Sequence, residues 1–210
     1  MRRDYLRDPD AIYRESFARI AAEVDLSDVP QAAQAMATRI VHACGMPDIV
    51  AELRFNGEVA GAARKALDFG APVLVDARMV AAGIMASRLP ATNDVVCMPD
   101  CGDTESKAAE LETTRSAAGV AACRDRLDGA VVAIGNAPTA LFQLLELLAD
   151  GAPRPAAVLA FPVGFVGAAE SKADLVAEAG DLPYATCLGR RGGSPFAAAA
   201  LNACLMDAGA

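Results

Sequence analysis

The chain has 210 residues, and 54% of them are hydrophobic, which is enough for the core of one large domain. The formal net charge of −8 argues against nucleic acid or an anionic membrane surface as the main partner. No stretch approaches the roughly 20 uninterrupted apolar residues of a membrane-spanning helix, and the charged N-terminus MRRDYLRDPD lacks the apolar segment of a secretory signal, so a single cytoplasmic domain over residues 1–210 is expected.

Six cysteines are spread along the chain, and only Cys97 and Cys101 lie close together, in CMPDC. A four-ligand zinc site would need a second such pair or nearby histidines. The chain contains a single histidine. We therefore predict free thiols in a reducing compartment and no metal site.

A first helix is expected to begin with Asp8 as its N-cap and to run to about Val24. Its buried side is marked by the apolar residues Ile12, Phe17, Ile20 and Val24. Ser16 shares that side, and a hydroxyl bonded back to its own helix is the simplest interpretation of it.

A second helix is expected over residues 30–44, with Gly45 just past its end. It carries His42, and Arg39 and Thr38 lie on the same face, three and four residues earlier. A lone histidine is most often an ordinary surface or core residue. In the last turn of a helix the dipole favours a charged imidazole, whereas Arg39 opposes that charge. His42 is therefore also a candidate proton donor, and the direction of its net pKa shift stays open.

The middle of the chain predicts helices over 55–69, 79–87 and 106–126, short strands over 73–75 and 95–97, and an exposed acidic loop over 100–105. Asp76 follows the first of these strands, where an acid either binds a ribose or caps the next helix. The polar cluster 113–116 is either a solvated face or a hydroxyl-and-guanidinium patch for a carboxylate.

Three strand–loop–helix units follow, over residues 131–148, 156–179 and 184–206. Such repetition predicts a parallel sheet with helices on both faces, and ligands of such sheets bind at the carboxyl ends of the strands. The Gly135–Asn136 turn before Pro138 predicts free backbone N–H groups, and hence an anion site. Ser194 is expected to cap the last helix.

The common chemical motifs are missing. No G-x-G-x-x-G fingerprint follows the strand at 131–134, the order G-K-[ST] of a P-loop does not occur, and there is no G-x-S-x-G elbow. The residues alone therefore predict a binder, or an acid–base catalyst, acting on a small polyanion.

Several longer segments are similar to those of the precorrin-8X methylmutase family, in the same order and over nearly the whole chain. They are RIVHACG (39–45), TRSAA (114–118), AIGNAPTAL (133–141), FPVGFVGAAESK (161–172) and GGS (192–194), together with DYLRD (4–8) and AIY (11–13).

The resemblance implies an isomerase of cobalamin biosynthesis with a single Rossmann-like three-layer domain. Family members move a methyl group from C-11 to C-12 of a corrin precursor, giving hydrogenobyrinate, and one branch acts on the cobalt-containing substrate. His42 corresponds to the family's proposed proton donor, and Ser16 and Arg39 correspond to substrate contacts. The resemblance also implies a tetrapyrrole substrate, a homodimer, and no cofactor.

Further substrate contacts are predicted from motif position and loop geometry: Arg115, Asn136, Lys172, Arg190 and Ser194. Lys172 is alternatively a solvated helix lysine, and Arg190 a surface charge. Two other functions remain open. One is an S-adenosylmethionine-dependent methyltransferase that uses Asp76 for the ribose, and the other is a non-catalytic corrinoid carrier.

Overall fold

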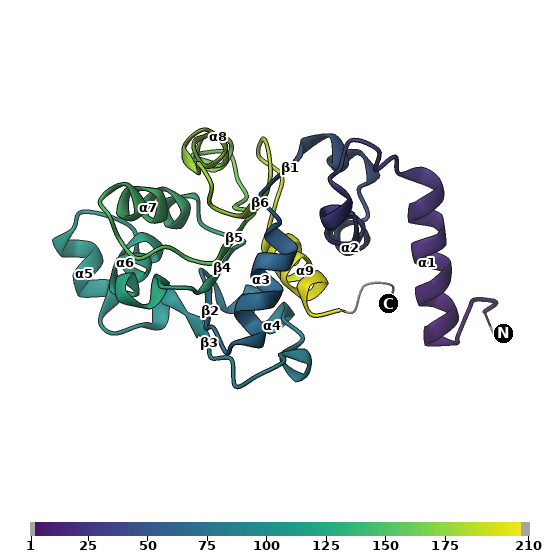
Figure 1. Ribbon diagram of the computed structural model, residues 1–210, viewed down its shortest axis with the longest axis horizontal. Coiled ribbons are helices and arrows are strands. Elements are labelled where there is room, and N and C mark those ends of the chain that lie inside the picture. The colour runs from purple at the N-terminus through teal and green to yellow at the C-terminus, as the bar shows by residue number, and fades with distance from the viewer. Residues whose placement is uncertain (1–2, 207–210) are drawn as a thin grey trace.

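Six strands form one sheet in the order β1-β6-β5-β4-β2-β3 in the computed structural model, which describes residues 3–206 (Figure 1). Every neighbouring pair is parallel except β1 and β6. The strands are β1 (Leu53–Asn56), β2 (Val73–Val75), β3 (Val95–Cys97), β4 (Val131–Ile134), β5 (Ala157–Ala160) and β6 (Tyr184–Cys187). The predicted α/β class and mostly parallel sheet are confirmed.

Nine α-helices and five short 3-10 helices connect the strands in the part of the chain that the structure describes. The α-helices are α1 (Pro9–Glu23), α2 (Gln34–Cys44), α3 (Val59–Asp68), α4 (Arg78–Gly83), α5 (Thr104–Glu110), α6 (Arg115–Ala122), α7 (Pro138–Ala149), α8 (Ala168–Glu178) and α9 (Ser194–Cys204). The 3-10 helices are η1 (Gln31–Ala33), η2 (Pro47–Glu52), η3 (Ala86–Arg88), η4 (Met98–Asp100) and η5 (Arg124–Leu127). None of the described helices is long and apolar enough to cross a bilayer.

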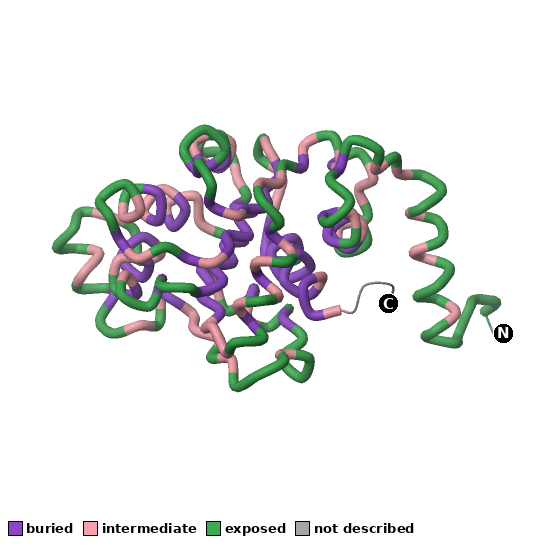
Figure 2. The backbone as a smooth tube through the Cα atoms, viewed as in Figure 1, coloured by how far each residue is buried: buried purple, intermediate pink, exposed green. Residues whose placement is uncertain are grey.

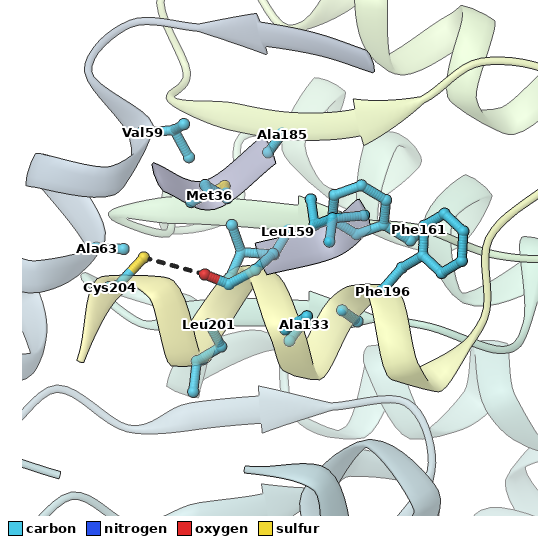
Figure 3. Packing of buried hydrophobic residues seen from close by; sticks show 14 of the residues in the cluster. Met36, Val59, Ala63, Ala133, Leu159, Phe161, Ala185, Phe196, Leu201 and Cys204 are labelled. Atoms are coloured by element: carbon cyan, nitrogen blue, oxygen red, sulfur yellow. Dashed lines mark hydrogen bonds between the residues drawn. The ribbon is translucent and has the colours of Figure 1, made fainter. Parts of the chain in front are cut away.

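The sheet separates two hydrophobic cores. Because side chains alternate along a strand, Val73 and Val75 of β2 face one core and Leu74 faces the other. The first core lies under α2, α3, α4 and α9, and the second lies under α6, α7 and α8. Figure 3 shows the first core, where the rings of Phe161 and Phe196 lie side by side above α9. This is a three-layer sandwich, as expected.

The predicted helix over 55–69 is wrong at its start. Phe55 and Asn56 belong to strand β1, and α3 begins only at Val59, after a turn at Gly57 with φ 56°. β1 pairs with β6, about 130 residues later, and the Asn56 side chain donates to the carbonyls of Gly180 and Leu182. Partners this distant in sequence leave no local pattern, so the strand was missed.

Other helix boundaries also differ from the prediction, and two of them have a clear cause. The helix expected over 106–126 is interrupted, because the Thr114 hydroxyl accepts from the N–H of Ala117 and thereby starts α6 as a separate helix. α9 is capped by the backbone of Gly193, and Ser194 is its first residue rather than its N-cap.

Helix α1 lies at the edge of the molecule, with α2 between it and the sheet (Figure 1). Asp8 caps it as predicted, by accepting from the N–H of Ala11. However, none of its residues is buried (Figure 2). Ile12 is 47% exposed. Only Ile20 and Val24, of the apolar side predicted to be buried, pack against the first core.

Candidate functional site

The site is centred on His42, which lies in the last turn of α2 just before Gly45 ends the helix in the left-handed conformation. Its Nδ1 is 2.9 Å from the hydroxyl oxygen of Ser16, and its ring stacks on Phe17 at a centroid distance of 4.8 Å. Since Nδ1 is engaged by Ser16, Nε2 is the ring nitrogen left for a ligand.

Arg39 lies one turn before His42 and is only 8% exposed. Its Nη2 donates to the hydroxyl of Tyr13 at 2.6 Å, and the guanidinium carbon is 5.7 Å from the centre of the Phe17 ring. One face of α1, formed by Tyr13, Ser16 and Phe17, therefore contacts the two candidate site residues of α2. Tyr13 was not predicted as a site residue, although its spacing from Ser16 and Phe17 places it on their face.

A cavity of about 490 Å³ opens beside His42, within the range of small-molecule sites. Its walls come from α1, α2, α4 and α9, and they are mostly apolar. The lining residues are Tyr13, Arg39, His42, Ala43, Met79, Gly83, Met85, Ser194, Pro195, Ala198, Ala199 and Asn202. The cavity thus runs along α9 and reaches the carboxyl edge of the sheet, where the ligand was expected, at the Ser194 end.

The pKa of His42 is lowered from its usual 6.5, chiefly because partial burial disfavours the charged ring and also because Arg39 is positively charged. The direction that the sequence left open is therefore downward, and burial is its larger cause. The free imidazole is therefore mostly neutral at neutral pH. A bound polyanion would raise its proton affinity.

A larger cavity, of about 750 Å³, lies at the other end of α1. Its wall carries the carboxylates of Glu23, Asp25, Asp28 and Asp48 against the single cation of Arg54. That charge would repel a polycarboxylate, whereas the cavity beside His42 offers Arg39 and no acid. The smaller cavity is therefore the better candidate for an anionic ligand.

Ser194 is the third predicted site residue that lines this cavity, together with Arg39 and His42. It is 9% exposed, and its hydroxyl oxygen is buried without a hydrogen-bond partner among the described residues. Asn202 also lines the cavity, but its side chain is fully used: it accepts from the N–H of Met85 and donates to the carbonyl of Gly83.

Arg115 lies at the start of α6, away from the cavity beside His42. Its Nη2 donates to Asp100 and to the carbonyl of Pro99, both at 3.1 Å. Asp100 also accepts two hydrogen bonds from Arg78. The guanidinium of Arg115 is therefore already paired with a carboxylate of the protein, that of Asp100.

The predicted anion site at the start of α7 is wrong, because the carboxylate of Asp76 occupies it. The N–H groups of Gly135, Asn136 and Ala137 donate to Asp76 at 2.7–2.9 Å. Asp76 is 2% exposed, so it caps this turn and is not available to a ribose. The side chain of Asn136 is exposed at the carboxyl edge and does not line the cavity.

Lys172 is fully buried, so the interpretation as a solvated helix lysine is wrong. Its ammonium donates to the carbonyl of Arg191 at 2.6 Å, and burial lowers its pKa to about 8. Arg190 is exposed and lies over the Phe165 ring at 5.3 Å. Neither residue lines the cavity beside His42.

Comparison with known proteins shows which family the chain resembles. Residues 11–206 match the family model described as precorrin-8X methylmutase. A precorrin-8X methylmutase of Pseudomonas aeruginosa is 55% identical, over 95% of this chain and 96% of that protein. One from Sinorhizobium is 53% identical, over 95% of each.

More distant relatives agree as well. A cobalt-precorrin-8 methylmutase of Priestia megaterium is 33% identical, over 93% of this chain and 86% of that protein. The crystal structure of the precorrin-8X methylmutase from Thermus thermophilus superposes with a TM-score of 0.84 at 38% identity, covering 93% of this chain and 94% of that one. The chain therefore belongs to the precorrin-8X methylmutase family, isomerases of cobalamin biosynthesis.

Proposed function

We propose that the protein moves a methyl group from C-11 to C-12 of precorrin-8X, giving hydrogenobyrinate, in the cavity beside His42, with His42 as proton donor. The observation that carries the proposal is the pairing of the chain's sole histidine with a buried arginine at an apolar cavity. A flat apolar ring fringed with carboxylates needs such walls, one cation and one source of a proton.

Each group has a distinct task in this proposal. Arg39 holds a substrate carboxylate, since a guanidinium offers paired donors to both carboxylate oxygens. Met79, Met85 and Ala198 pack against the ring, and the methionine side chains adapt to its outline. Nε2 of His42 protonates the macrocycle, the methyl shifts within one molecule, and loss of a proton from the rearranged ring restores the imidazolium. The reaction is therefore balanced as an isomerisation and consumes no redox cofactor or methyl donor.

Ser194 is proposed as a further contact because it lies in the cavity wall with an unpaired hydroxyl. Arg115, Asn136, Lys172 and Arg190 stay predictions as substrate contacts. Lys172 in particular would have to leave its bond to Arg191 before it could touch a ligand.

The principal test replaces His42 by alanine. We expect the variant to fold and to bind the tetrapyrrole, while conversion slows about 10²- to 10⁴-fold, the usual contribution of a general acid. Conversion is followed by the absorption spectrum of the conjugated ring under single-turnover conditions. Binding is followed by quenching of the protein's tyrosine fluorescence or by equilibrium dialysis. Glu15→Gln, on the exposed side of α1, is the matched control. Wild-type turnover by the alanine variant would contradict the proton-donor role, and absence of conversion by the unmodified protein would favour a carrier.

We further propose that the natural substrate is metal-free. The relatives above 50% identity are named precorrin-8X methylmutases, whereas those named for the cobalt substrate are near 30% identity. The ratio of kcat/KM for metal-free and cobalt-containing precorrin-8 tests this, and a preference for the cobalt compound would contradict it.

A homodimer in the cytoplasm completes the proposal. All six cysteines are free thiols, which suits a reducing compartment. The apolar side chains that α1 and the segment before it leave exposed, among them Tyr5, Leu6 and Ile12, are of the kind that subunit contacts cover.

A further inference from the structure

Helix α1 is loosely attached to the rest of the molecule. It nevertheless contacts His42 and Arg39, the two side chains that the proposed function depends on. It contributes no buried residue, yet Tyr13, Ser16 and Phe17 all contact His42 or Arg39. Most of the helix could be replaced without loss of core packing. The face that carries Tyr13 and Ser16 is different, because their hydroxyls form hydrogen bonds with the arginine and the histidine of the proposed reaction.

We propose that Ser16 and Tyr13 are positioning residues, Ser16 for the imidazole of His42 and Tyr13 for the guanidinium of Arg39. The inference rests on the proposed function for the roles of His42 and Arg39. It departs from the resemblance, which implies that Ser16 contacts substrate directly.

The hydroxyl of Ser16 suits both protonation states of the histidine. It accepts a hydrogen bond from Nδ1–H of the charged ring, and its own proton can turn toward Nδ1 when that nitrogen is bare. When the charged ring donates from Nε2, Nδ1 keeps its proton and its bond to Ser16, so the ring keeps one orientation through the transfer. The Phe17 ring, stacked on the imidazole at 4.8 Å, fixes the plane in which it lies.

The hydroxyl of Tyr13 orients the guanidinium of Arg39 in a similar way. It occupies Nη2 at 2.6 Å, and the other guanidinium nitrogens remain for a carboxylate. The same ring lies 6.0 Å from that of His42, edge to face, so that Tyr13 contacts both groups.

The first experiment needs no substrate, because the single histidine gives one set of imidazole signals. Nitrogen-15 NMR of the free protein reports the tautomer and the pKa of His42 directly. Arg39 on α2 and Tyr13 on α1 are the only other ionisable side chains lining this cavity among the described residues, since α4 and α9 present none.

We expect Ser16→Ala to lower the pKa of His42 further, because the charge-assisted bond from Nδ1–H is lost. Ser16→Thr, which keeps the hydroxyl, is expected to restore it. Glu15→Gln, one residue away on the exposed side, should leave the signals unchanged. An unchanged pKa and tautomer in Ser16→Ala would overturn the assignment, whether or not the protein is a methylmutase.

The second experiment separates the two hydroxyls kinetically. Ser16→Ala should lower kcat about tenfold and leave KM little changed. A loss of this size is the smallest usually seen when a partner that orients a functional imidazole is removed. The pH at which the activity of this variant falls on the alkaline side should also be lower than in the wild type. Tyr13→Phe keeps the ring and should raise KM with the pH profile unchanged. If Ser16→Ala raised KM alone and left the pH profile unchanged, Ser16 would be a substrate contact and the proposal would be wrong.

Discussion

At the residue scale, His42 is held in an environment that resists its charge until a ligand arrives. Burial and Arg39 both lower its pKa in the free protein. A substrate that brings several carboxylates to Arg39 would screen that cation and favour the imidazolium. Proton donation would thereby be coupled to binding.

This predicts different pH profiles for the two kinetic parameters. Because the acid form is required, kcat/KM, which reports the free enzyme, should fall as pH rises through a value below 6.5. The profile of kcat, which reports the complex, should fall at a higher pH. Coincident profiles would show that bound substrate does not change the proton affinity of His42.

Lys172 gives a second residue-scale prediction, on stability. Between about pH 8, the pKa in the native chain, and 10.5, its ordinary value, the unfolded chain binds a proton that the native chain does not. The free energy of unfolding contributed by this residue should therefore rise with pH across that window. Urea unfolding of the wild type and of Lys172→Met measures the difference, and parallel pH curves would contradict the prediction.

The sequence showed part of this site by itself. Arg39 and His42 are three residues apart on one helix, so their shared face follows from helical geometry. The contact between Ser16 and His42 joins residues 26 positions apart, and only the resemblance connected them. Lys172 could not be placed, because a motif gives no burial, and its buried bond to Arg191 depends on how the loop before α9 folds back.

At the element scale, the turn between β4 and α7 depends on a carboxylate from another strand. Asp76, at the end of β2, satisfies three N–H groups that have no partner within α7. Replacement by alanine should reduce the free energy of unfolding by about 3 kcal/mol or more, since several buried donors lose a charged acceptor. Asp125→Ala, at a side chain 95% exposed, should have almost no effect. Equal denaturation midpoints of the two variants would contradict this role.

The strand–loop–helix units after residue 130 were predictable because each is local: an apolar run, a glycine turn and a helix start follow one another. β1 was not, since an edge strand of four residues is defined by its pairing with β6. The predicted anion site failed for a similar reason. The turn correctly predicted N–H groups that have no partner within α7. However, the carboxylate that accepts from them belongs to Asp76, about 60 residues earlier in the chain.

At the scale of the whole molecule, the apolar side chains left exposed on and before α1 predict association between copies. We expect sedimentation velocity at micromolar concentration to give twice the mass of one chain, with dissociation on dilution. A single-chain mass over the whole concentration range would contradict the proposed homodimer and leave α1 supported by α2 alone.

The packing of α2 against α9 has a consequence for synthesis. The two helices enclose one cavity, yet they lie near opposite ends of the chain, with Tyr13 and His42 in the first quarter and Asn202 near the end. While the ribosome is still translating, the early helices lack the wall they need, and β1 has no strand to join until β6 emerges. A nascent chain therefore lacks one wall of the cavity until α9 has emerged, and chains that end before α9 should not bind the ligand of this site.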